Sequence, residues 1–335
     1  MLFLQNLLHL SLEEKTLKAH KGMINRELIR IKIVQLTYAY YQNGHKNMSH
    51  AEKELMFSLS KAYDLYNMLL LLIVAVNKEM RRKLEVLANR AEREGTPPPS
   101  FKFVDNRFAL QLEENHMLMA FQESNKLTWD DDVEFVRKLV NTIEQSELYR
   151  EYMANEEDDY EVDREVWRKI YRTLIQDNED LDALLEEKSL YWNDDKEVVD
   201  TFVLKTIKRF NPKSAGKQEL LPEYKDEEDK DFASKLFRST ILNADVYQKY
   251  MSEASRNWDF SRLAYMDVVI MQIAIAEMLT FPNIPVSVTI NEYVELAKLY
   301  STPKSGGYIN GMLDAIARHL HDTKVMLKPV PERKD

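Results

Sequence analysis

Glycine is scarce in this chain, and that scarcity constrains the fold more than any other sequence feature. The 335 residues include only seven glycines, whereas an average protein contains about 7% glycine. With so few glycines, many turns cannot be tight hairpin turns of the kind that demands glycine, so helices are favoured over a strand-rich fold. We therefore expect an all-α protein.

The bulk composition is that of a soluble globular protein. Hydrophobic residues make up 44% of the chain and charged residues 30%. The net charge of −10 argues against a protein that coats nucleic acid through bulk charge, although a local basic patch is compatible with it. The chain has no cysteine, so it has no disulfide, thiolate metal site or cysteine nucleophile. These features fit a reducing cytoplasm.

Three of the seven glycines lie within six residues, inside a segment that runs from Pro285 to Asp314. Apolar residues at helical spacing predict two packed helices joined by a polar loop at residues 301–307. The first helix carries Ile290, Val294 and Ala297 on one face, and the second carries Ile309, Met312, Leu313, Ile316 and Leu320. Thr289 and Glu292 have capping-box spacing, which predicts that the first helix begins there.

The same segment contains an ordered series of short motifs. They are Ile284-Pro285, Ile290-Asn291-Glu292, Val294-Glu295-Leu296-Ala297-Lys298 and Tyr308-Ile309-Asn310-Gly311-Met312-Leu313-Asp314. In this order they resemble the C-terminal signature of the NusB family of bacterial transcription antitermination factors. The resemblance covers about residues 23–60 and 231–322, roughly 40% of the chain. It implies a NusB-like pair of packed helical bundles.

The spacing of apolar residues in 24–43 predicts a strongly amphipathic helix. We expect Leu28, Ile31, Leu36 and Tyr38 on its buried face, and Arg26, Arg30 and Lys32 to project from its first half. The stretch is similar to the first helix of the family, which implies that these three cations bind RNA phosphates. Glu27 and Leu28 stand where the family often has further basic residues, so fewer cations would contact the RNA phosphates here.

The polar loop is the second predicted part of the RNA site. Lys304 supplies a cation, Ser305 lies at the helix start, and Tyr308 offers a ring that can stack on an unpaired base. In similar proteins this loop and the first-helix cations together hold single-stranded boxA RNA. Without the family context, Tyr308 packing inward is the competing interpretation.

An apolar helix from Leu263 to Leu279 carries the predicted partner site. The resemblance implies that Asp267 contacts NusE, the ribosomal small-subunit protein that acts in antitermination. An acidic residue facing a basic ribosomal protein is electrostatically favourable. Gln272 stands where the family usually has an arginine, which removes one charge from this helix.

The middle of the chain, residues 61–230, has no counterpart in short family members and is predicted to be a helical insertion. Residues 144–200 hold 20 Asp or Glu against 7 Lys or Arg, a net charge of −13, yet keep apolar periodicity. Connectors are expected near 95–100 and at 211–231. The apolar run at 68–76 is too short to span a bilayer and predicts a buried helix centre.

Three assignments remain open in the sequence. Residues 1–22 are either an extra amphipathic helix or a wrongly included upstream start; we favour the second, because the resemblance begins at Met23. The NusB-like part resumes at 231–325 and leaves 326–335 as a frayed tail. A weak echo between 135–153 and 232–251 is either chance or a duplication.

No catalytic pattern appears, neither a nucleophile elbow nor a P-loop nor a dinucleotide fingerprint. Four successive carboxylates at 156–159 lack the spacing and glycine of a calcium loop. We predict no enzyme, no cofactor and no metal site.

The resemblance implies a cytoplasmic antitermination factor for ribosomal RNA operons, acting with boxA RNA, NusE and the RNA polymerase antitermination complex, and not with DNA or a membrane. Two other classes stay open. NusB-like domains also front RNA cytosine methyltransferases, which need a cofactor domain and a catalytic cysteine that this chain lacks. The second is a protein–protein scaffold with weak or lost RNA binding.

Overall fold

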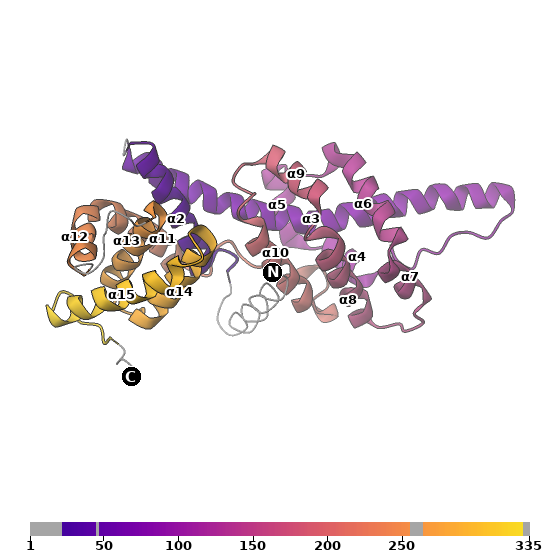
Figure 1. Ribbon diagram of the computed structural model, residues 1–335. Coiled ribbons are helices and arrows are strands. Elements are labelled where there is room, and N and C mark those ends of the chain that lie inside the picture. Colours follow the sequence, from indigo (N-terminus) through magenta and orange to yellow (C-terminus); the bar gives the residue numbers. More distant parts are fainter. Residues whose placement is uncertain (1–21, 45–46, 255–263, 331–335) are drawn as a thin grey trace. The chain divides into compact units, whose positions relative to one another are not determined.

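The computed structural model describes residues 22–44, 47–254 and 264–330. The regular elements in these ranges are helices (Figure 1), which confirms the all-α expectation. The single β-contact among the described residues is an isolated parallel bridge between Ile24 and Tyr224.

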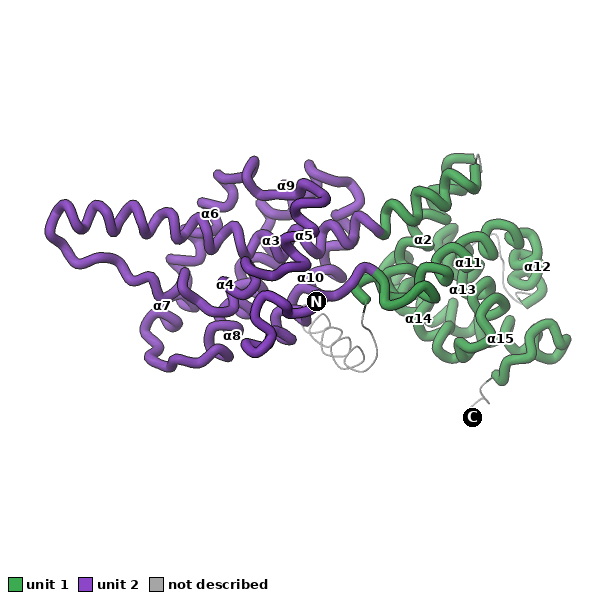
Figure 2. Tube along the Cα trace, turned by 180° about the vertical axis from the view of Figure 1, so that it is seen from behind, with its two compact units in different colours: residues 1–59, 224–335 green, residues 60–223 purple. Residues whose placement is uncertain are grey.

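The chain divides into two compact units (Figure 2). Unit 1 combines Met1–Leu59 with Tyr224–Asp335, and unit 2 is Ser60–Glu223. One boundary therefore falls inside the long helix α3 (Met48–Glu94). The units are defined by packing alone, so the family assignment of residues 23–60 and 61–230 stays a prediction.

Unit 1 is built around α13 (Tyr265–Thr280), whose residues 269–278 are all buried. A helix that is apolar on every side is stable only when other elements surround it. The surrounding helices are α2 (Arg26–Gln42), α11 (Glu227–Leu242), α12 (Ala244–Ala254), α14 (Val286–Tyr300) and α15 (Ser305–Asp322). The predicted start at Leu263 lies outside the described residues.

The entry to α2 is fixed by close packing. Asn25 caps the helix, because its Oδ1 accepts the Leu28 N–H at 2.9 Å. A side chain at Gly22 would put a Cβ 2.2 Å from the backbone nitrogen of Lys225. Gly22 is therefore part of unit 1, while the rest of the predicted extension, residues 1–21, lies outside the described residues.

The two helices of the signature segment form, but their boundaries differ from the prediction. Helix α14 begins at Val286 with Pro285 at its N-cap position, so the capping box predicted at Thr289 is wrong. Helix α15 already begins at Ser305, which shortens the loop to residues 301–304. Gly306 lies where a Cβ would meet the Lys298 side chain at 3.4 Å, so the two helices approach closely there.

Unit 2 packs on the middle of α3. The apolar run at 68–76 is buried apart from the half-buried Ala75, as predicted. The Trp129 indole donates to the Met68 carbonyl at 2.8 Å. Helix α3 is long and apolar enough to cross a membrane, yet 72% of its apolar window is buried, which marks it as a core helix.

The remaining elements of unit 2 are short helices. They are α4 (Arg107–Glu113), α5 (His116–Asn125), the 3₁₀ turn η2 (Asp130–Asp132), α6 (Val133–Gln145), α7 (Glu147–Ala154), α8 (Tyr160–Ile170), the π-helical segment η3 (Tyr171–Ile175), α9 (Glu179–Lys188), α10 (Lys196–Arg209) and the 3₁₀ segment η4 (Pro212–Lys217). The acidic stretch 144–200 is thus folded and helical, as predicted. Whether it is an insertion, and whether α6–α7 duplicates α11–α12, stay predictions.

The two predicted connectors behave differently. Residues 96–100 have no regular structure, as three prolines require. The segment 211–231 is more ordered than a linker: it contains η4, and Leu220 and Leu221 are buried. The tail is also packed where we expected fraying, since Met326 is buried and the Lys328 ammonium donates to the Ile284 carbonyl at 2.9 Å.

Candidate nucleic-acid interface

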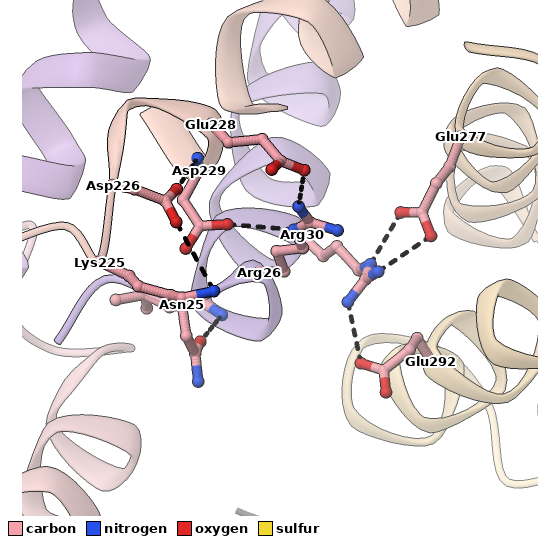
Figure 3. Close-up of polar contacts among 10 residues, drawn as sticks. Asn25, Arg26, Arg30, Lys225, Asp226, Glu228, Asp229, Glu277 and Glu292 are labelled. Atoms are coloured by element: carbon pink, nitrogen blue, oxygen red, sulfur yellow. Dashed lines mark hydrogen bonds and ion pairs between the residues drawn. The ribbon is translucent and has the colours of Figure 1, made fainter. Parts of the chain in front are cut away.

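Arg26 opens α2 and is paired rather than free. Its Nη2 donates to Glu228 Oε1 at 2.7 Å and its Nε to Asp229 Oδ1 at 3.1 Å (Figure 3). The guanidinium also lies over the Phe232 ring, 5.1 Å from its centroid. The side chain keeps 30% of its exposure, so it remains reachable from solvent.

Arg30 is buried, and the expectation that it projects from the helix is wrong. Its Nε and Nη2 donate to the two carboxylate oxygens of Glu277 at 2.7 and 2.9 Å, and its Nη1 donates to Glu292 at 3.2 Å (Figure 3). Burial by itself lowers the pKa of Arg30, but the charge and hydrogen bonds of Glu277 outweigh it and raise that pKa above its ordinary value. Arg30 therefore stays charged inside the protein.

The same carboxylate gathers two hydroxyl groups from α14. Thr289 donates to Glu277 Oε1 at 2.9 Å and Tyr293 donates to Oε2 at 3.0 Å. Thr289 and Glu292, expected to cap a helix, instead complete this interior cluster. Burial and the nearby Glu277 charge raise the pKa of Tyr293 well above its ordinary value, so the phenol is neutral. The cluster ties α2, α13 and α14 together.

The third predicted cation of α2 is also inside. Lys32 is 2% exposed, so it does not project as expected. The reason is geometric: residues 28–34 of α2 are buried without a break, because the helix lies between neighbours rather than on one surface. Helical periodicity in the sequence predicted, by contrast, that the polar residues of α2 face solvent.

Asp267 lies at the start of α13 and holds the loop between α14 and α15. It accepts a hydrogen bond from Ser301 at 2.5 Å and another from Ser305 at 3.0 Å. Ser305 also bonds the Thr302 hydroxyl at 2.8 Å. Asp267 is 5% exposed and Ser305 is 3% exposed, so neither presents its side chain to a partner or to RNA as expected.

The start of α15 is the accessible part of the predicted site. Lys304 is exposed, whereas Tyr308 is half-buried with its hydroxyl oxygen inside the protein, so its ring packs partly inward. No side chain caps the helix start. The Ser305 N–H donates to the Thr302 carbonyl at 2.9 Å, so the first-turn donors left for a ligand are those of Gly306 and the exposed Gly307. Gly307 and Gly311 have nothing within 4 Å of a notional Cβ, so the backbone is open here. Burial and the Asp267 charge raise the pKa of Tyr308, which keeps its ring neutral.

An exposed tyrosine pair flanks the loop and was missed in the sequence. Tyr38, expected in the core, is 37% exposed, and Tyr265 is 46% exposed. Their rings meet edge to face, 5.7 Å between centroids. Gln35 donates to the Tyr300 hydroxyl at 3.1 Å, which places this half of α2 beside the end of α14. The three tyrosines at positions 38, 40 and 41 are the sequence feature from which an exposed aromatic surface could have been predicted.

The structure therefore separates Arg26 from the loop that carries Lys304. Gln35 lies about 13 Å along α2 from Arg26, at 1.5 Å per residue. Arg26 contacts α11, whereas the loop contacts α13 and the Gln35 end of α2. Gln272 does not face a partner either: it is buried and donates to the Thr240 carbonyl at 2.8 Å and to Tyr41.

Comparison with known proteins identifies a family domain in the chain. Residues 201–318 match the model described as the NusB family. The chain carries a NusB family domain. The matched range includes the buried Glu277 and the exposed start of α15, but not α2. It begins within α10, which belongs to unit 2, so the match and the compact units do not share a boundary.

Curated proteins named "Transcription antitermination protein NusB" resemble the chain. The protein of Salinibacter ruber (strain DSM 13855 / M31) is 37% identical over 102 residues, 30% of this chain and 64% of that protein. That of Dictyoglomus turgidum (strain DSM 6724 / Z-1310) is 42% identical over 93 residues, 28% of this chain and 65% of that protein. That of Natranaerobius thermophilus (strain ATCC BAA-1301 / DSM 18059 / JW/NM-WN-LF) is 45% identical over 85 residues, 25% and 61% of the two chains.

The chain spans between 47% and 65% of the length of these and similar NusB relatives. No solved structure matches it. These relatives are named as transcription antitermination proteins and not as enzymes, in agreement with the prediction that the chain is no enzyme. Among the described residues, no three His, Asp or Glu side chains are grouped to hold a metal ion.

Proposed function

We propose that the chain is a cytoplasmic transcription antitermination factor that binds single-stranded boxA-type leader RNA together with a NusE-like ribosomal small-subunit protein. It acts within the RNA polymerase antitermination complex and promotes processive transcription of ribosomal RNA operons. The observation that carries the proposal is the NusB family domain with an open, uncapped start of α15.

The RNA contact in this proposal centres on Lys304 and Tyr308. Lys304 attracts a phosphate, the uncapped N–H groups of α15 can donate to it, and the Tyr308 ring stacks on a base. Arg26 plays a lesser part, because a phosphate must compete there with Glu228 and Asp229. Arg30, Lys32 and Ser305 act by holding the surface in shape.

The partner contact in this proposal moves from Asp267 to its exposed neighbours. Tyr265 is two residues from Asp267 and pairs with Tyr38. Exposed tyrosines are enriched at protein interfaces, because each combines a large apolar area with a polar end. Asp267 supports this surface by fixing the adjacent loop.

Fluorescence anisotropy with a labelled boxA RNA, with and without the NusE-like protein, tests the proposal. Removal of one stacking ring costs about 1–3 kcal/mol, so Tyr308→Ala should weaken binding roughly 5- to 150-fold. Lys304→Gln should weaken it about fourfold near 0.15 M salt, the effect of one lost phosphate contact. Tyr250→Ala on α12 and Lys53→Gln on α3 are matched controls. Equal affinity of all four variants and the parent would contradict the RNA site.

A scaffold without RNA binding is the second candidate. It is favoured by one observation: two of the three α2 cations are buried and the third is paired. In that case the NusE-like protein binds and Tyr38→Ala weakens it, while boxA RNA changes neither the affinity nor the anisotropy. RNA-dependent tightening of the protein complex would exclude this candidate.

A further inference from the structure

Unit 2 contains a compact basic stretch within an acidic background. The unit holds 24 Lys or Arg against 35 Asp or Glu, a net charge of −11. Residues 201–218, at the end of α10 and through η4, hold five cations and no carboxylate. A local reversal of sign in an acidic unit points to a ligand of opposite charge.

Four of the five cations in this stretch are exposed, whereas Lys205 is half-buried and lies over the Phe202 ring. Lys208, Arg209, Lys213 and Lys217 are all exposed, and no carboxylate pairs with them in the described part of the chain. Other cations of the unit are held, as Lys188 is by Asp132 at 2.7 Å. Cations at the end of a helix offset its dipole, which accounts for Lys208 and Arg209. Lys213 and Lys217 lie beyond the helix and need another reason.

The backbone that presents Lys213 and Lys217 is fixed by side chains of α4 and α5. Gln111 donates to the carbonyls of Asn211 and Ala215 at 2.9 and 2.8 Å. Asn115 donates to the Gln218 carbonyl at 2.7 Å, and the Asn211 N–H donates to Gln218 Oε1 at 3.0 Å. The Asn211–Gln218 hydrogen bond joins the two ends of the loop, and Gln111 and Asn115 hold its backbone.

Two positions in the loop are constrained, Ala215 by its backbone dihedrals and Gly216 by a close neighbour. Ala215 has φ 46° and ψ −143°, a region that is costly for a residue with a Cβ. A Cβ at Gly216 would lie 2.6 Å from the Glu114 carbonyl oxygen, so only glycine fits there. Strain of about 1–3 kcal/mol persists only where the surroundings impose it. The loop is held in one shape rather than left to relax.

We propose that the end of α10 and the loop at 211–218 bind the phosphates of single-stranded RNA without regard to base sequence. The rigid loop keeps two lysines in place, which reduces the entropy lost on binding. The proposal adds a second contact to the one at α15, and it relies on the proposed function only in taking the polyanion to be RNA.

The test is a salt titration of the full chain with a 20-nucleotide oligouridylate. Each phosphate contact on a single strand contributes a slope of about 0.7 in log affinity against log salt. Lys213→Gln with Lys217→Gln should therefore reduce the slope by about 1.4 and weaken binding about tenfold near 0.15 M salt. Lys126→Gln with Lys169→Gln removes two exposed lysines elsewhere in unit 2 and should change neither quantity.

The two proposals fail in different ways. Unchanged slope and affinity in the Lys213 and Lys217 variant would overturn the second contact, whatever happens to boxA binding. Tyr308→Ala could leave the affinity for boxA RNA unchanged while the lysine variant still weakens oligouridylate binding. In that case the contact at α15 is wrong and the second contact stands.

Discussion

Two regions of unit 1 use polar residues in opposite ways. Around Arg30, the buried arginine, the buried Glu277 and two hydroxyls satisfy one another in the interior, with the half-buried Glu292 at the edge, and they join three helices. At the start of α15, Lys304 and Gly307 are exposed, and no side chain caps the helix. The first region organises the fold, and the second is left available. The difference teaches that charged residues of a binding-family signature are not all binding residues.

The largest effect should come from breaking the interior cluster. Arg30→Ala leaves Glu277 buried without its cation, which costs about 3–5 kcal/mol of unfolding free energy. Urea unfolding followed by circular dichroism measures it. Arg26→Ala is the comparison on the same helix. Its guanidinium is 30% exposed and pairs with the exposed Glu228 and the buried Asp229, so we expect a smaller cost than at Arg30. Equal costs for the two substitutions would erase the distinction between the regions.

A smaller effect should follow from releasing the loop. Asp267→Ala removes the buried acceptor that Ser301 and Ser305 share, which should cost about 1–3 kcal/mol of unfolding free energy. The same variant should weaken boxA binding, because the start of α15 loses its anchor. Asp245→Ala, at an exposed position on α12, should cost at most about 1 kcal/mol. A stable Asp267→Ala protein with full partner binding lost would return Asp267 to a direct partner role.

The smallest effect concerns the open backbone of α15. Gly307→Ala should raise the unfolding free energy by about 0.5–1 kcal/mol, because alanine is the better helix former and nothing lies within 4 Å. It should also weaken boxA binding several-fold if RNA approaches this backbone. Gly311→Ala, one turn later, should give the same stabilisation with less effect on RNA. Identical RNA affinities for both variants and the parent would remove the glycine backbone from the site.

The fold was largely accessible from sequence, and the inward or outward direction of side chains was not. Low glycine content and helical periodicity identified an all-α chain and the buried centre of α3. Periodicity alone misplaced Arg30, because an arginine is predicted to face solvent unless a buried carboxylate such as Glu277 is known to lie opposite. That partner is 247 residues away in the chain.

The site shows the same limit on a smaller scale. Lys304 and Tyr308 could be chosen because they adjoin a glycine-rich helix start. Asp267 was taken as a surface residue, since nothing in a single sequence shows that Ser301 and Ser305 fold back onto it. Tyr38 was assigned to the core because a tyrosine at helical spacing is usually buried, and only the packing of α2 shows its exposed ring.

Ultraviolet cross-linking of boxA RNA to the full chain, with the modified peptide located by mass spectrometry, tests the central claim most directly. The claim is that the start of α15 touches RNA while the α2 charges organise the interior. We expect cross-links within residues 299–318, at Tyr308 or beside Lys304. Cross-links confined to residues 26–34 of α2, with none on α15, would contradict it.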